Sequence, residues 1–162
     1  MISVVIATLN DEARLGRALE PLIPAAISGL VREVIVCDGG STDATLAVAD
    51  DAGARILQSD ADREARIRSG CEAAKGSWLL LLDPGAWLEP AWQEAAEAHI
   101  RMFPNAAAYF PSAAGGWLRR FRRTADDALL AAVTQRDRIV SWPRGISARR
   151  LQARVFPAGP RS

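Results

Sequence analysis

EVIVCDGGSTDAT, residues 33–45, is the stretch of this sequence that decides its fold. Its first half is apolar and β-branched, which is typical of a strand buried on both faces of a parallel sheet. Its second half passes through Asp38 and two glycines into polar residues that can cap a helix. A strand that leads straight into a helix begins a strand–helix–strand unit, so the stretch predicts one parallel strand with a carboxylate at its end.

The same alternation recurs on both sides of this stretch. Strand patterns lie at residues 2–9, 32–38, 54–59 and 77–83, and helix patterns follow them at residues 10–30, 41–53, 62–75 and 91–103. Pro21 and Pro24 should break or kink the first helix, and Pro90 suits the start of the last. Successive units of this length predict one α/β domain over residues 1–155, with a mostly parallel Rossmann-like sheet, flanking helices and a frayed tail at residues 156–162.

The pattern weakens after Pro104. Residues 106–111 and 138–142 predict short strands. Between them, residues 115–135 form the pattern of a basic amphipathic helix behind a Gly-Gly hinge.

The start of that predicted helix, residues 117–123, places Trp, Leu and Phe on one face among four arginines. This combination suits peripheral contact with an anionic membrane surface or with a lipid-linked acceptor. The alternative is that the aromatic residues cover part of the sheet while the arginines are solvated. The rest of the sequence has no basic stripe, so no nucleic-acid partner is expected.

Composition and charge exclude several classes of protein. The chain is 49% apolar and 24% charged with a net charge of +1, which is typical of a globular protein and not of a disordered one. Cys37 and Cys71 have no metal-binding spacing, so a cytoplasmic setting is expected, although their pairing stays open. The first residues lack a basic region and no segment reaches about 18 apolar residues, so membrane contact should be peripheral, at the inner face.

Polar residues end three of the predicted strands. Thr8 and Asn10 lie at the end of the first strand, Asp38 ends the second, and Asp83 ends the strand at residues 77–83. Ligands of open α/β sheets bind at this edge, towards which helix N-termini also point. Turn and cap chemistry explains the glycines after Asp38 but does not require the acid.

Three ordered motifs, VVIATLND, EVIVCDGGSTDAT and AAKGSWLLLLD, resemble those of the inverting family-2 glycosyltransferases of the GT-A fold. The resemblance covers roughly residues 2–92 in order and spacing. It implies transfer of a sugar from a nucleotide-diphosphate sugar, of the UDP or GDP type, to an acceptor that the sequence does not name. It also implies a nucleotide site formed by Thr8, Asn10, Glu12, Asp38, Gly39 and Asp83.

The resemblance further implies Mg²⁺ or Mn²⁺ at an Asp-x-Asp motif beside the donor diphosphate. Asp83 occupies the place of the first acid, but Gly85 stands where the second is expected. Because hard cations prefer carboxylate and phosphate oxygens, we expect a weakened metal site at Asp83. Glu89 either completes that site or is an ordinary acid in the first turn of a helix.

The general base is missing as well. Relatives place an acid in a segment that matches WPRGISARR, residues 142–150, and Pro143 stands in its place. Proline cannot take the proton of the acceptor hydroxyl. Asp126 and Asp127 are the remaining catalytic candidates, and the alternative for both is a solvated acidic pair on a helix.

Two arginines precede the strand of Asp83. Arg63 and Arg66 lie three positions apart in a helix pattern and can share a face. Guanidinium groups bind diphosphate in bidentate fashion and would partly replace a metal. The alternative is a solvated face that pairs with nearby acids. His99 is expected in an exposed helical position without a metal role.

Three hypotheses for the function follow. The first, supported by the intact donor-side motifs, is an inverting glycosyltransferase that uses a nucleotide-diphosphate sugar. The second, favoured by the two missing acids, is a catalytically inactive nucleotide- or nucleotide-sugar-binding or regulatory protein of the same fold. The third treats the polar strand ends only as turns and caps, and the three ordered motifs argue against it.

Overall fold

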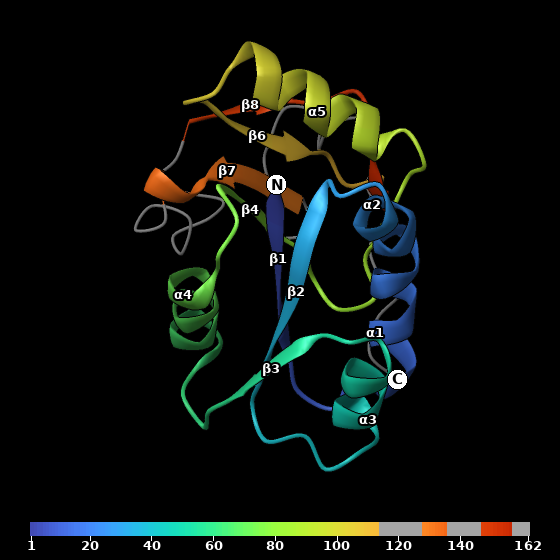
Figure 1. The fold of residues 1–162 in the computed structure, drawn as a ribbon. Helices are drawn as coiled ribbons and strands as arrows, with labels where there is room; N and C mark the ends of the chain where they lie inside the picture. Colours follow the sequence, from blue (N-terminus) through green and yellow to red (C-terminus); the bar gives the residue numbers. More distant parts are fainter. Residues whose placement is uncertain (114–127, 136–146, 157–162) are drawn as a thin grey trace.

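The computed structural model describes residues 1–113, 128–135 and 147–156, and its elements follow the alternation expected from the sequence (Figure 1). Its strands are β1 (Ile2–Thr8), β2 (Val31–Asp38), β3 (Arg55–Gln58), β4 (Trp78–Leu81), β5 (Trp87–Leu88), β6 (Ala107–Phe110), β7 (Ala128–Ala132), β8 (Ala148–Arg150) and β9 (Val155–Phe156). Its helices are α1 (Glu12–Leu19), α2 (Ile23–Ile27), α3 (Thr45–Asp51), α4 (Arg63–Ala73) and α5 (Trp92–Met102), with 3₁₀ turns η1 (Glu20–Leu22) and η3 (Val133–Gln135). The proline-rich segment after α1 forms η1 and α2 in place of one continuous helix, as predicted.

A seven-stranded sheet in the order β3-β2-β1-β4-β7-β6-β8 forms the centre of the molecule. The strands β3, β2, β1 and β4 are mutually parallel, whereas β7 is antiparallel to both β4 and β6. A separate pair, β5 and β9, joins Trp87 to Phe156. The four parallel strands bring their carboxyl ends, and the polar residues on them, to one edge of the sheet.

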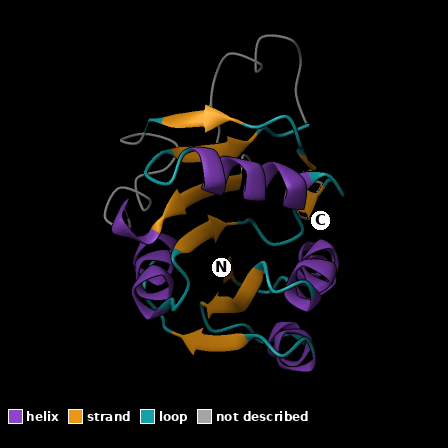
Figure 2. Ribbon diagram, turned by 45° about the horizontal axis from the view of Figure 1, so that its top comes forward, coloured by secondary structure: helices purple, strands orange, loops and turns teal. Residues whose placement is uncertain are grey.

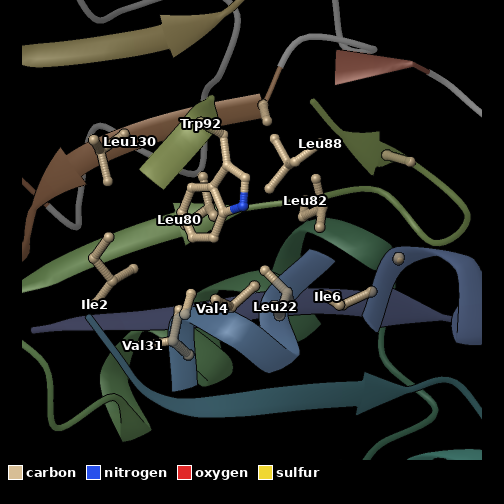
Figure 3. Packing of buried hydrophobic residues seen from close by; sticks show 14 of the residues in the cluster. Ile2, Val4, Ile6, Leu22, Val31, Leu80, Leu82, Leu88, Trp92 and Leu130 are labelled. Atoms are coloured by element: carbon tan, nitrogen blue, oxygen red, sulfur yellow. The ribbon is translucent and has the colours of Figure 1, made fainter. Parts of the chain in front are cut away.

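Helices cover both faces of this sheet, which confirms the α/β fold class (Figures 1 and 2). One apolar core includes residues of α1, α2, α3 and α5, and a second core on the other face includes Ile67 and Cys71 of α4. β1 belongs to both cores because its successive side chains point to opposite faces, and all seven of its residues are buried. Figure 3 shows the fully buried Trp92 indole of α5 among Leu80, Leu88 and Leu130 in the larger core.

The helix predicted at residues 115–135 is wrong over residues 128–132, which form β7 between β4 and β6, and its residues 115–127 lie outside the described part of the chain. All five β7 residues are buried. A short, continuous apolar run fits a buried strand as well as a buried helix, and here the pairing with two neighbouring strands decides between them. The strand predicted at residues 138–142 lies outside the described residues.

His99 is the second correction, because its side chain is only 4% exposed. One ring nitrogen lies 2.7 Å from the carbonyl oxygen of Ala106, and the ring packs edge-on against Trp78. His99 therefore lies on the buried side of α5 and has a structural role. The mixed helical pattern around it did not indicate this burial.

Two glycines give a matched test of this packing. A Cβ added at Gly70 of α4 would lie 2.5 Å from the Cys37 sulfur and 2.7 Å from a Val5 methyl, whereas one added at Gly16 of α1 would meet nothing within 4 Å. We expect Gly70→Ala to lower the free energy of unfolding by about 1–3 kcal/mol through overpacking. Gly16→Ala should raise it by about 0.5–1 kcal/mol. Urea denaturation measures both, and equal effects would contradict the close packing of α4 on the sheet.

Candidate functional site

Asp38 joins the carboxyl ends of β1 and β2. Its side chain is 0% exposed, and its Oδ1 atom accepts hydrogen bonds from the hydroxyls of Thr8, at 2.9 Å, and Ser41. Its Oδ2 atom accepts from the backbone N–H groups of Gly40, at 2.9 Å, and Ser41, at 2.8 Å. Gly40 has a φ of 90°, a conformation that favours glycine, and this turns the chain back over the carboxylate. The DGGS sequence thus folds around its own acid.

These hydrogen bonds also set the protonation of Asp38. Burial by itself would raise the pKa of the carboxyl, but the hydrogen bonds from Ser41, Thr8 and Gly40 outweigh burial and hold the pKa below its ordinary value. Asp38 is therefore a buried, ionised anchor between two strands.

The loop after β1 is tied to the loop after β2 by Asn10 and Glu12. The Asn10 side-chain oxygen accepts the N–H of Thr42 at 2.8 Å, and Asn10 itself has a φ of 53°. A Glu12 carboxylate oxygen accepts the N–H of Ala44 at 3.2 Å. The side-chain oxygens of both residues thus bind the neighbouring loop, and their role in binding a nucleotide stays a prediction.

A cavity of about 310 Å³ opens at the carboxyl ends of β1 and β4. Its lining residues are Ala7, Thr8, Leu9, Arg14, Arg63, Arg66, Asp83 and Pro84. Of the residues proposed from the sequence, the cavity thus unites Thr8, Asp83 and the two arginines of α4. The others, Asn10, Glu12, Asp38 and Gly39, belong to the adjoining loop junction.

The two arginines of α4 have different environments. Arg63 forms an ion pair with Asp83 across the cavity. Arg66 is only 7% exposed and donates from Nη1 to the carbonyl oxygen of Thr8 at 2.8 Å. The solvated alternative is therefore wrong for Arg66, because the helix turns this side chain inward over the end of β1.

Gly39 makes room for that guanidinium. A Cβ at this position would lie 1.6 Å from Nη1 of Arg66, so any side chain at position 39 would displace the arginine. The first glycine of the DGG motif thus serves a contact with a helix that begins 24 residues later in the chain.

Arg14 is a site residue that the sequence analysis missed. It lies in the first turn of α1, pairs with Asp11 at 3.2 Å and lines the cavity. A cation in the first turn of a helix opposes the helix dipole, and this is the sequence signal that could have marked it. Arg63, the first residue of α4, has the same unusual placement.

The acids of the cavity do not fit a metal site built by the protein. Asp83 is the one carboxylate among the described lining residues, and it is already paired with Arg63. Gly85 provides no side-chain oxygen, and Glu89 accepts the N–H of Arg154 instead. Across residues 1–113, 128–135 and 147–156, no group of three or more His, Cys, Asp or Glu side chains is placed to hold a metal ion.

Other predicted features can be placed only in part. Cys37 and Cys71 are both buried, and burial raises the pKa of the Cys37 thiol to about 11, so this sulfur stays a protonated thiol at neutral pH. Asp126, Asp127 and the basic segment 117–123 lie outside the described residues. Within the described part of the chain, no helix has the length and apolar character needed to cross a bilayer.

Comparison with known proteins identifies the family. The model of the family described as Glycosyl transferase family 2 matches residues 3–155. The chain belongs to glycosyl transferase family 2. A TPR repeat-containing protein of Synechococcus elongatus is 32% identical over 159 residues, which cover 83% of this chain and 38% of that protein. Glucosyl-3-phosphoglycerate synthase of Mycolicibacterium smegmatis is 43% identical over 60 residues, covering 37% of this chain and 20% of the synthase.

Solved structures show the same fold. Glucosyl-3-phosphoglycerate synthase of Mycobacterium tuberculosis, in complex with Mn²⁺, UDP and glucosyl-3-phosphoglycerate, has a TM-score of 0.72 at 17% identity, over 99% of this chain and 73% of that one. S. aureus TarS in complex with UDP-GlcNAc has a TM-score of 0.75 at 15% identity, over 99% of this chain and 59% of that one. The fold of this family-2 chain is thus of the GT-A type, and the chain spans well under half the length of the curated relatives above.

The Asp38 junction gives a pH-dependent prediction. Asp38→Asn should lower the free energy of unfolding at pH 7 by about 1–3 kcal/mol, because it puts an amide group among donors that need an acceptor. Since the folded-state pKa of Asp38 is depressed, its stabilisation is complete above the unfolded value of about 3.9 and is lost as the pH falls through the folded value.

Urea denaturation between pH 7 and pH 3 measures this difference. The gap between wild type and Asp38→Asn should stay constant down to about pH 4 and narrow below it, while Asp60→Asn, at an exposed position, should match wild type throughout. A gap that is independent of pH would contradict the ionised anchor.

Proposed function

We propose that this chain is the donor-binding domain of a glycosyltransferase that takes its sugar from a nucleoside diphosphate. The cavity beyond β1 and β4 is the observation that supports this most strongly. It lies where open α/β sheets bind ligands, and three arginines surround it. Guanidinium groups in this number suit a phosphate ligand better than an uncharged one.

The residues divide into two roles. Arg63 and Arg66 are assigned to the diphosphate, and the junction of Thr8, Asp38 and Gly39 to the adjoining nucleoside. Asn10 and Glu12 hold the loops around this junction, as their hydrogen bonds to Thr42 and Ala44 indicate. Cationic side chains at the diphosphate would also stabilise the charge that grows on it as the sugar departs.

Inverting transfer needs a base that takes the proton of the acceptor hydroxyl. Asp126 and Asp127 remain the candidates for this base. A lipid-linked acceptor, reached through peripheral membrane contact of residues 117–123, remains our proposal for the other substrate.

A second candidate function is nucleotide-sugar binding without transfer. The ion pair between Arg63 and Asp83 favours it, because that carboxylate is the single one among the described lining residues and is already engaged. The two candidates share the donor site and differ only in turnover.

Calorimetric titration with UDP, GDP and their sugars tests the shared donor site. At least one nucleotide should bind, and Arg63→Gln should weaken its binding about tenfold, since a charge-assisted contact to phosphate is lost. Arg32→Gln, at an exposed position near the other end of β2, should have no effect. Release or transfer of sugar from the bound donor would select the transferase. Absence of binding by every nucleotide at millimolar concentration would contradict both candidates.

A further inference from the structure

We propose that the donor diphosphate is held in this chain by the guanidinium groups of Arg14, Arg63 and Arg66, without a divalent cation held by the protein. The inference rests on the proposed function for the nature of the ligand. It goes beyond that function because it states that arginine side chains, among them the buried Arg66, take the place of a metal ion at the diphosphate.

The unbalanced charge of Arg66 is the first observation. Its side chain is more than nine-tenths buried, yet it forms no ion pair with any described residue. Its Nε atom is buried and has no hydrogen-bond partner among the residues described. A buried cation is costly unless an anion balances it. A bound anion would be the balancing partner that the described residues do not provide.

The surroundings of Arg66 hold it in place for such a ligand. Nη1 donates to the carbonyl oxygen of Thr8, which also accepts the N–H of Gly39 at 2.9 Å. The guanidinium lies where a Cβ of residue 39 would stand. Arg66 is therefore fixed at the cavity wall by backbone contacts, and its charge is left for an occupant.

The remaining charges favour the same ligand. Arg14 and Arg63 line the cavity as well, and each is matched by one aspartate, Asp11 and Asp83 respectively. Arg66 forms no such pair with a described residue, and the ionised carboxylate of Asp38 is already bound by the hydroxyl and N–H groups of its own junction. The Nε atom of Arg14 is a further buried donor without a partner in the described part of the chain.

Removing the charge of Asp83 should change diphosphate binding in opposite directions in a metal site and in an arginine site. If Asp83 held a cation, removing its charge would weaken diphosphate binding. In an arginine site the same carboxylate repels the phosphates and competes for Arg63, so Asp83→Asn should bind diphosphate at least as tightly as wild type.

Inorganic pyrophosphate is the probe, because it reports on the arginines without needing a nucleoside. We expect calorimetric binding to the full chain in EDTA, and an effect of Mn²⁺ smaller than about threefold. Arg66→Gln should weaken binding about tenfold or more, and Arg66→Lys should lie between the two, because it keeps the charge but not the planar geometry. Arg68→Gln, exposed on the same helix, should match wild type.

Thermal unfolding of the free proteins separates loss of binding from loss of folding. Arg66→Gln should melt at or above the wild-type temperature, because it removes an unbalanced buried charge. If Arg66→Gln does not fold, pyrophosphate binding by Arg66→Lys and Asp83→Asn still tests the arginine site.

Three outcomes would overturn the inference: binding of pyrophosphate only with Mn²⁺, weakening by Asp83→Asn, or equal binding by the Arg66 and Arg68 variants. A parallel titration with UDP keeps the two proposals apart. Metal-dependent UDP binding would leave the proposed function intact and remove the arginine site. Binding of pyrophosphate without metal, together with no binding of any nucleotide, would leave the arginine site intact and remove the proposed function.

Discussion

The carboxylate of Asp38 holds together the part of the molecule on which the site depends. It is fully buried, and it accepts hydrogen bonds from Thr8 at the end of β1 and from Gly40 and Ser41 after β2. With these bonds in place, the first strand ends at a fixed distance from the loop that follows the second. The carbonyl of Thr8 is then available, at the same point, to accept from Arg66. A single ionised group thus connects two strands, one loop and the helix α4.

The glycine after this aspartate links the local turn to the distant helix. Gly39 leaves space for the Arg66 guanidinium, and any residue with a Cβ at this position would fill that space. The arrangement costs stability in the free protein, since Arg66 is buried without a balancing carboxylate among the described residues. Costs of this kind are common where a site is preorganised for a charged ligand.

The sequence was sufficient for the parallel half of the fold, because buried strands and capped helices have local signatures. It failed at residues 128–132, where pairing with β4 and β6 outweighs a run that also suits a helix. In the site, the places of Asp38 and Asp83 at strand ends mark them in the sequence, and the spacing of Arg63 and Arg66 in the helix pattern before the strand of Asp83 marks these two. The burial of Arg66 and the role of Arg14 depend on contacts between distant segments, which no local pattern encodes.

Membership of glycosyl transferase family 2 and the absent second acid at Gly85 suggest how this domain differs from relatives whose structures contain Mn²⁺ and UDP. The central claim is that arginines take the place of the cation. A crystal structure of the chain with UDP and Mn²⁺, recorded with anomalous scattering at the manganese edge, tests it most directly. The account predicts diphosphate oxygens bonded to the Arg66 guanidinium and no anomalous peak at Asp83. A manganese peak bridging Asp83 and the diphosphate, with Arg66 unchanged, would contradict it.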